Sequence, residues 1–221
     1  MGNLYLVSTP IGNLDDITIR AIKILSSVDL VLCEDTRHTG LLLQKLNIQT
    51  KLLSYYDEIE DKRIPEIIEM LGQNKNIALV SDSGTPLVSD PGFRLVRECM
   101  KRGIKVESIP GPSAVLAALT SSGLPPDKFI FLGYPPEKQS ARLECFKKLS
   151  PNITTIFYCA PHKLASTIND LQSVLGDIEI VITRELTKVH EEVWRGSIEQ
   201  CLEHFQNPRG ELVILFFLSK K

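Results

Sequence analysis

Short apolar segments alternate with amphipathic helical segments along nearly the whole chain, and this alternation most restricts the fold. Such an order is typical of α/β domains, in which helices connect and cover the strands of a sheet. In the first half, strands are predicted at 3–8, 29–34, 51–56, 76–81 and 105–109, and helices at 16–28, 38–46, 61–73, 91–102 and 112–121. In the fourth of these helices, Phe93, Val96 and Met100 are predicted to form the apolar face.

The segment SSGLPPDK at 121–128 is the best candidate for a linker, because Gly123, Pro125 and Pro126 interrupt any regular element. After it, strands are predicted at 129–134, 154–159, 178–183 and 211–217, and helices at 138–148, 162–174 and 197–205. We therefore predict two α/β domains, an N-terminal domain at 1–123 and a C-terminal domain at 124–221.

Composition excludes several classes of protein. The formal net charge of −2 provides no overall attraction to nucleic acid or to an anionic membrane, so any RNA contact must come from a local patch. No apolar run is long enough to span a bilayer and no signal peptide is visible, so a cytoplasmic protein is expected. The five cysteines include no C-x-x-C pair, and neither a disulfide nor a metal site is expected.

Polar loops rich in proline and glycine follow the predicted strands, and the longest is SDSGTPLVSDPG at 81–92. Ligands of open α/β sheets bind beyond the carboxyl ends of the strands, where these loops lie. The loop after the first strand, TPIGNLDD, contains neither G-x-G-x-x-G nor G-x-x-x-x-G-K-[ST]. A nucleotide-like ligand is therefore expected to bind in a non-Rossmann manner.

Six segments together resemble the S-adenosylmethionine-dependent tetrapyrrole methylases: TPIGNLDDIT (9–18), EDTRHTGLLL (34–43), ALVSDSGTPLVSDPG (78–92), PGPSA (110–114), FYCAPHKL (157–164) and RELTK (184–188). The combination of EDTR with SDSGTPLVSDPG is similar to the branch that methylates the ribose 2′-oxygen of a cytidine in 16S ribosomal RNA. The resemblance covers nearly the whole chain.

The resemblance implies two α/β domains with S-adenosylmethionine in the cleft between them, no metal, and a homodimer. The implied partner is 16S rRNA within the small ribosomal subunit, and no membrane is involved. Carried over by position, the donor contacts are Pro10, Gly84, Thr85, Pro86, Leu87, Val88, Ser113, Ala114, Tyr158, Leu186 and Thr187.

Methylation of a ribose hydroxyl requires that the hydroxyl lose its proton, so a base within hydrogen-bond reach would assist the reaction. Asp35 and Glu34, after the second strand, are the candidate bases, and Arg37 could contact a neighbouring phosphate. Two alternatives are that these three residues form a structural charge network, and that Asp35 alone caps a helix. Asp90, immediately before Pro91, is also interpreted as a helix cap.

Local positive charge for RNA could come from a stripe of basic residues, although a solvated helix face has the same pattern. The stripe would comprise Lys138, Arg142, Lys147, Lys148, Lys163 and Arg37. The segment EKQSARLECFKK (137–148) is less basic than its counterpart in many members of the branch, because it includes Glu137 and Glu144.

Two other functions remain open. One is methylation of a corrin or porphyrin precursor, which would use the same fold and donor site. The other is a protein without catalytic activity that binds a nucleotide.

Overall fold

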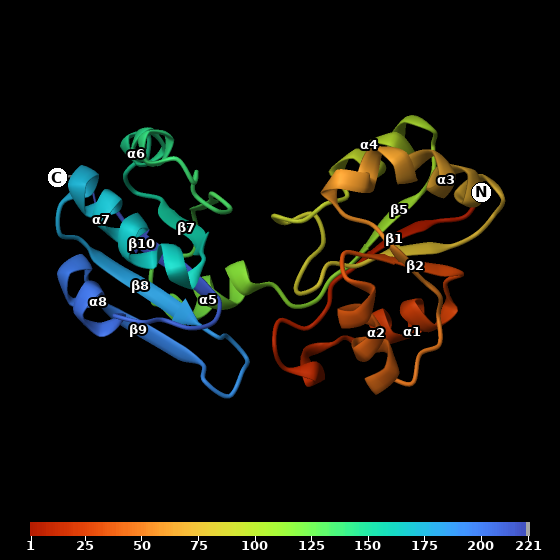
Figure 1. Ribbon diagram of the computed structural model, residues 1–221, viewed down its shortest axis with the longest axis horizontal. Coiled ribbons are helices and arrows are strands. Elements are labelled where there is room, and N and C mark those ends of the chain that lie inside the picture. Colours follow the sequence, from red (N-terminus) through yellow and green to blue (C-terminus); the bar gives the residue numbers. More distant parts are fainter. Residues whose placement is uncertain (220–221) are drawn as a thin grey trace. The chain divides into compact units, whose positions relative to one another are not determined.

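The computed structural model describes residues 1–219 and consists of two compact units, Met1–Ser113 and the part of the chain from Ala114 onward (Figure 1). The division falls before helix α5 (Ala114–Ser122), whereas the linker pattern placed the boundary after it. The difference arises because α5 packs against strands of the second unit. Within the described range, no helix has the length and apolar character needed to cross a membrane.

The first unit is built on a five-stranded sheet in the order β3-β2-β4-β1-β5, and every pairing in it is parallel. Its strands are β1 (Leu4–Val7), β2 (Leu30–Cys33), β3 (Leu52–Ser54), β4 (Ile77–Leu79) and β5 (Val106–Ile109). Its helices are α1 (Ile19–Ser27), α2 (Thr36–Lys45), α3 (Glu60–Gly72) and α4 (Phe93–Lys101). Because the strands are parallel, their carboxyl ends share one edge of the sheet.

Helices cover both faces of this sheet: α1 and α2 lie on one side, and α3 and α4 on the other (Figure 1). The predicted apolar face of α4 was wrong for two of its three residues, because Val96 packs against the core but Phe93 and Met100 do not. Leu95 and Cys99, an i, i+4 pair, point into the core, whereas Phe93 and Met100 are 61% and 69% exposed. The helix has apolar residues on two faces, so periodicity alone could not identify the face that packs on the sheet.

The second unit contains a mixed sheet in the order β6-β7-β10-β8-β9. Its strands are β6 (Phe129–Phe131), β7 (Thr154–Cys159), β8 (Glu179–Arg184), β9 (Glu192–Ser197) and β10 (Leu212–Phe217). The central strand β10 runs antiparallel to both β7 and β8, so β7 and β8 end at the same edge. Strand β9 was not predicted, because its sequence EVWRGS includes two charged residues and a glycine and it lies at the edge of the sheet.

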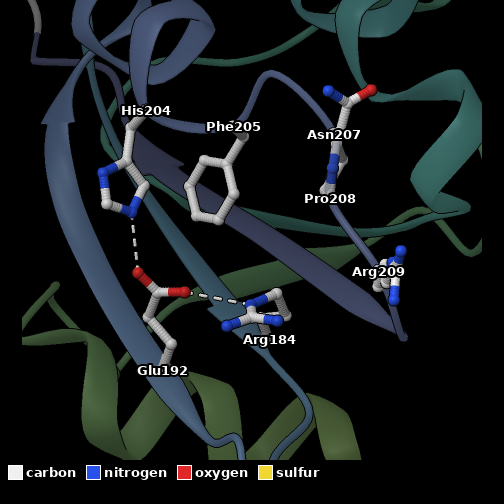
Figure 2. A pocket seen from close by; sticks show the side chains of 7 residues that line it. All are labelled: Arg184, Glu192, His204, Phe205, Asn207, Pro208 and Arg209. Carbon is white, nitrogen blue, oxygen red and sulfur yellow. Dashed lines mark hydrogen bonds and ion pairs between the residues drawn. The ribbon is translucent and has the colours of Figure 1, made fainter.

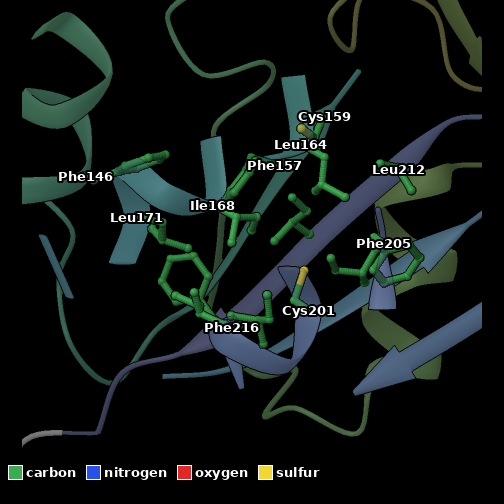
Figure 3. Packing of buried hydrophobic residues seen from close by; sticks show 14 residues of the cluster. Phe146, Phe157, Cys159, Leu164, Ile168, Leu171, Cys201, Phe205, Leu212 and Phe216 are labelled. Atoms are coloured by element: carbon green, nitrogen blue, oxygen red, sulfur yellow. The ribbon is translucent and has the colours of Figure 1, made fainter. Parts of the chain in front are cut away.

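Helices α6 (Gln139–Lys147), α7 (Leu164–Leu175) and α8 (Ile198–His204) contribute to the core of the second unit. Phe146, Phe157, Leu171 and Phe216 are fully buried there, and Figure 3 shows these side chains gathered between the helices and the strands. Aromatic and aliphatic burial of this kind supplies most of the favourable free energy of folding.

Arg142 of α6 is buried rather than exposed to solvent. Its guanidinium lies 2.5 Å from the carboxylate of Asp170 and donates further hydrogen bonds to the carbonyls of Pro136 and Glu137. These contacts satisfy the charge inside the unit, as a buried ion requires. The prediction that Arg142 belongs to an RNA-facing stripe was therefore wrong.

Candidate functional site

Three loops of the first unit are joined at the carboxyl edge of its sheet. The amide of Thr9 donates to the carbonyl of Gly84 at 2.9 Å, and the amide of Gly84 donates back to the carbonyl of Thr9 at 3.1 Å. The hydroxyl of Thr85 donates to the carbonyl of Pro112 at 3.0 Å, and the hydroxyl of Ser8 donates to Thr85 Oγ1 at 3.3 Å. The loops that carry Pro10, Gly84–Val88 and Ser113 are thereby held side by side.

This junction depends on close approach of the backbones. A Cβ atom built on Gly111 would lie 2.9 Å from Cβ of Ser8, so only glycine fits between the two loops. Gly84 has a φ of +80°, in the left-handed region that glycine occupies without strain.

Two of the segments that were predicted to contact the donor contain residues other than glycine in the left-handed backbone conformation, with positive φ. Apart from three asparagines, which tolerate this conformation, the non-glycine residues with positive φ among residues 1–219 are Leu87, Ser89, Glu185 and Thr187. Such residues cost about 1–3 kcal/mol each and cluster at ligand-binding segments. Both loops therefore have backbone that fits a role in holding a ligand such as S-adenosylmethionine.

Three of the predicted contacts in the second unit, Tyr158, Leu186 and Thr187, lie at one edge of its sheet. Tyr158 is near the end of β7, where its ring packs edge-on against Phe131 at 4.8 Å and near Tyr134 at 5.4 Å. Leu186 and Thr187 follow β8, and the amide of Thr187 donates to the carboxylate of Glu191 at 2.5 Å. Ala114 is the first residue of α5.

Carboxyl groups gather at the ends of the three neighbouring strands β3, β2 and β4. Burial and the negative charges of Asp90 and Asp82 raise the pKa of Glu34 to about 7. Burial, together with the charges of Asp82 and Asp57, raises the pKa of Asp90 to about 6, although a hydrogen bond with Ser81 opposes the shift. The cluster has no metal-binding arrangement: within residues 1–219, no group of three His, Cys, Asp or Glu side chains could hold a metal ion.

Asp35 has the opposite environment from its neighbour Glu34. Its carboxylate caps α2 by accepting the amide N–H of Arg37 at 2.8 Å, and it pairs with the guanidinium of Arg37, also at 2.8 Å. The hydrogen bonds from Arg37 lower the pKa of Asp35 to about 2. The alternative that Asp35 caps a helix is confirmed.

The predicted capping role of Asp90 was wrong. Gly92, with a φ of +124°, is the N-terminal cap residue of α4, and no side chain accepts a hydrogen bond from the amides at this helix start within residues 1–219. Asp90 is instead a member of the carboxyl cluster. Asp57 was not among the predicted site residues, although its position after the third predicted strand, at the same sheet edge, could have indicated it.

Comparison with known proteins identifies the family of this chain. Residues 3–202 match the family described as Tetrapyrrole (Corrin/Porphyrin) Methylases. The chain belongs to this family. It is 46% identical to "Ribosomal RNA small subunit methyltransferase I" of Thermotoga maritima, over 97% of this chain and 98% of that one. It is 43% identical to the protein of the same name in Escherichia coli O157:H7, over 97% of this chain and 77% of that one.

Solved structures of the family share the fold. The uroporphyrin-III C-methyltransferase of Thermus thermophilus, in complex with S-adenosyl homocysteine, has a TM-score of 0.68 at 19% identity. The similarity covers 97% of each chain. Together with the two sheets described above, this likeness confirms the predicted α/β class with two domains and a non-Rossmann architecture.

The raised pKa of Glu34 predicts that the free energy of unfolding falls as the pH rises from about 4.5 to about 7. In this window the folded protein binds more protons at Glu34 than the unfolded chain does, so raising the pH favours unfolding. Urea denaturation of the wild type and of Glu34→Gln between pH 4.5 and 7.5 should show a flatter dependence in the variant. Glu66→Gln removes an exposed carboxylate of α3 as a control, and equal slopes in wild type and Glu34→Gln would contradict the prediction.

Proposed function

We propose that this chain transfers a methyl group from S-adenosylmethionine to the ribose 2′-hydroxyl of a cytidine in 16S rRNA of the small ribosomal subunit, in the cytoplasm. The observation that carries the proposal is 46% identity, over nearly the full length of both chains, to a protein named as a methyltransferase of small-subunit rRNA. The strand-end loops at the junction of Thr9 and Gly84 support it, because they contain the motifs typical of that branch.

The residues proposed to hold the donor fall into two sets. Pro10, the Gly84–Val88 turn and Ser113 belong to the first unit, and Ala114, Tyr158, Leu186 and Thr187 belong to the second. The donor supplies an electrophilic methyl group on a sulfonium. The chain's own contribution is to hold the hydroxyl in line with that group, to exclude water and to accept the proton.

Of the two candidate bases, Glu34 suits proton abstraction better than Asp35. A general base works best when its pKa lies near the working pH, and the pKa of Glu34 is raised to about 7. The pKa of Asp35 is about 2, so its carboxylate has little tendency to take a proton. Arg37 is 89% exposed at its side chain and could contact an RNA phosphate through the N–H groups that Asp35 does not occupy.

A methyl-transfer assay with labelled S-adenosylmethionine tests the proposal directly. We expect label in small subunits from cells that lack this modification, at one cytidine that then resists alkaline cleavage. Naked rRNA and uroporphyrinogen III are included as separate substrates. Label in the tetrapyrrole alone would establish the alternative substrate, and no transfer to any of the three would favour a protein that only binds a ligand.

Glu34→Gln should lower kcat by about 10²–10⁴-fold, because it removes the base while leaving the shape of the side chain. Asp35→Asn should have a smaller effect that acts through the start of α2. Calorimetric titration should give the same affinity for S-adenosylmethionine in Glu34→Gln and in the wild type. Retention of kcat within threefold in Glu34→Gln would rule out Glu34 as the base.

We also propose that the protein is a homodimer. The exposed apolar side chains of Phe93 and Met100 on α4 support this, since apolar groups of this size gain free energy from burial against a second copy. Light scattering should give twice the chain mass of 24.7 kDa. A mass equal to one chain at micromolar concentration would contradict the dimer.

A further inference from the structure

A pocket of about 300 Å³ lies in the second unit (Figure 2). None of its lining residues is proposed to contact the donor, although Arg184 is the first residue of the RELTK segment that contains Leu186 and Thr187. It is formed by the end of β8, the start of β9, the end of α8 and the segment before β10. The side chains that give it its chemistry are Arg184, Glu192, His204, Phe205, Asn207 and Arg209. Its volume is at the lower end of the range of ligand pockets, about 300–1,000 Å³, and suits one small group better than a whole cofactor.

Arg184 is held in place by a chain of polar contacts. Arg184 and Glu192 are paired residues in the β8–β9 register, and Nε of Arg184 donates to Oε2 of Glu192 at 2.9 Å. The other carboxylate oxygen lies 2.7 Å from Nε2 of His204 (Figure 2). The ring of His204 stacks on Trp194, with 5.6 Å between centroids. The guanidinium is therefore fixed through one nitrogen, and within residues 1–219 its two terminal amino groups have no hydrogen-bond partner and are available to a ligand.

Glu192 does not make the pocket repel anions. Burial alone would raise the pKa of this carboxyl, but the hydrogen bonds with His204 and Arg184 lower it overall. Each of its oxygens has a positively charged or hydrogen-bonding partner, so the carboxylate orients Arg184 and its charge is offset locally.

Arg209 supplies a second cation. It lies on the segment with Asn207 and Pro208, which borders the pocket on the side away from Glu192 (Figure 2). Its side chain is exposed, and within residues 1–219 its guanidinium takes part in no hydrogen bond or ion pair. Two guanidinium groups and one carboxylate leave an excess of positive charge. Guanidinium groups bind phosphate with two parallel hydrogen bonds, a geometry that lysine cannot offer.

We propose that this pocket binds a phosphate group, and that in the working enzyme the group is a backbone phosphate of the substrate RNA. The RNA as its source rests on the proposed function, whereas phosphate binding does not. Contacts to the RNA backbone position a strand without reading its bases, which is the task of a site outside the reacting centre.

Trp194 provides a built-in probe, because it is the only tryptophan of the chain and stacks on His204. Its fluorescence is followed during titration with inorganic phosphate and with a single-stranded oligonucleotide of 16S rRNA sequence. We expect a saturable change with both in the wild type. Arg209→Gln should lower the affinity for inorganic phosphate and the affinity for the oligonucleotide at least about tenfold each, as expected for loss of a charge-assisted hydrogen bond. Arg209→Lys should restore only part of the affinity.

The dependence of RNA affinity on salt identifies the contact. Loss of one phosphate contact should reduce the slope of log K against log salt by about 0.7 in Arg209→Gln. Arg102→Gln, which removes an equal charge from the end of α4, should leave the fluorescence response to phosphate unchanged. Affinity for S-adenosylmethionine should be the same in all variants.

Each outcome decides one part of the proposal. Arg209→Gln could abolish the fluorescence change with inorganic phosphate and leave the salt dependence of RNA affinity unchanged. That result would mean that the pocket binds a small phosphate compound, and it would overturn the proposal that RNA is the ligand. No phosphate response in the wild type, together with an unchanged slope, would overturn the whole. A phosphate response in a protein that fails to methylate rRNA would leave the pocket standing and remove the proposed function alone.

Discussion

The pair of backbone hydrogen bonds between Thr9 and Gly84 is the contact on which the first unit's site depends. In a parallel sheet the loops at the carboxyl edge are separate connections, and nothing in the strand pairing brings their tips together. Here the exchange of two amide–carbonyl bonds joins the loop after β1 to the loop after β4. The hydroxyl of Thr85 then extends the junction to the loop after β5. Loops tied at several points can hold a ligand in one geometry at little cost in conformational entropy.

Electrostatics at the same edge separates two carboxyl groups that are neighbours in the chain. Glu34 is partly buried among other carboxyl groups, and its pKa rises to about 7. Asp35 turns toward Arg37 and solvent, and its pKa falls to about 2. Pairs of acidic groups whose pKa values are driven apart are typical of sites that move protons. The cause is the sheet order: β3, β2 and β4 are adjacent, so Asp57, Glu34 and Asp82 all follow strands that end side by side.

Periodicity and turn residues were enough to predict both α/β units, because buried parallel strands and amphipathic helices have distinct patterns. They failed for β9, whose edge position requires little hydrophobicity, and for α4, whose sequence offers two apolar faces. The position of the candidate loops at the carboxyl edge was predictable, because these loops directly follow the predicted strands. The environments of single side chains were not. The burial of Arg142 follows from a partner twenty-eight positions away, Asp170, and no local pattern indicates that contact.

The burial of Arg142 also changes how an acidic chain can hold RNA. With a net charge of −2, the protein depends on local cations, and the predicted stripe on α6 is weaker than its sequence suggests. Arg142 is paired inside the unit, and the charge of Lys147 is offset by Glu144 at 2.8 Å. Arg184 and Arg209 are separated from α6 in sequence and occupy a concave site in which a phosphate would be partly desolvated. Since ion pairs strengthen as water is removed, the oriented guanidinium of Arg184 together with that of Arg209 can contribute more in a pocket than several solvated lysines on a helix.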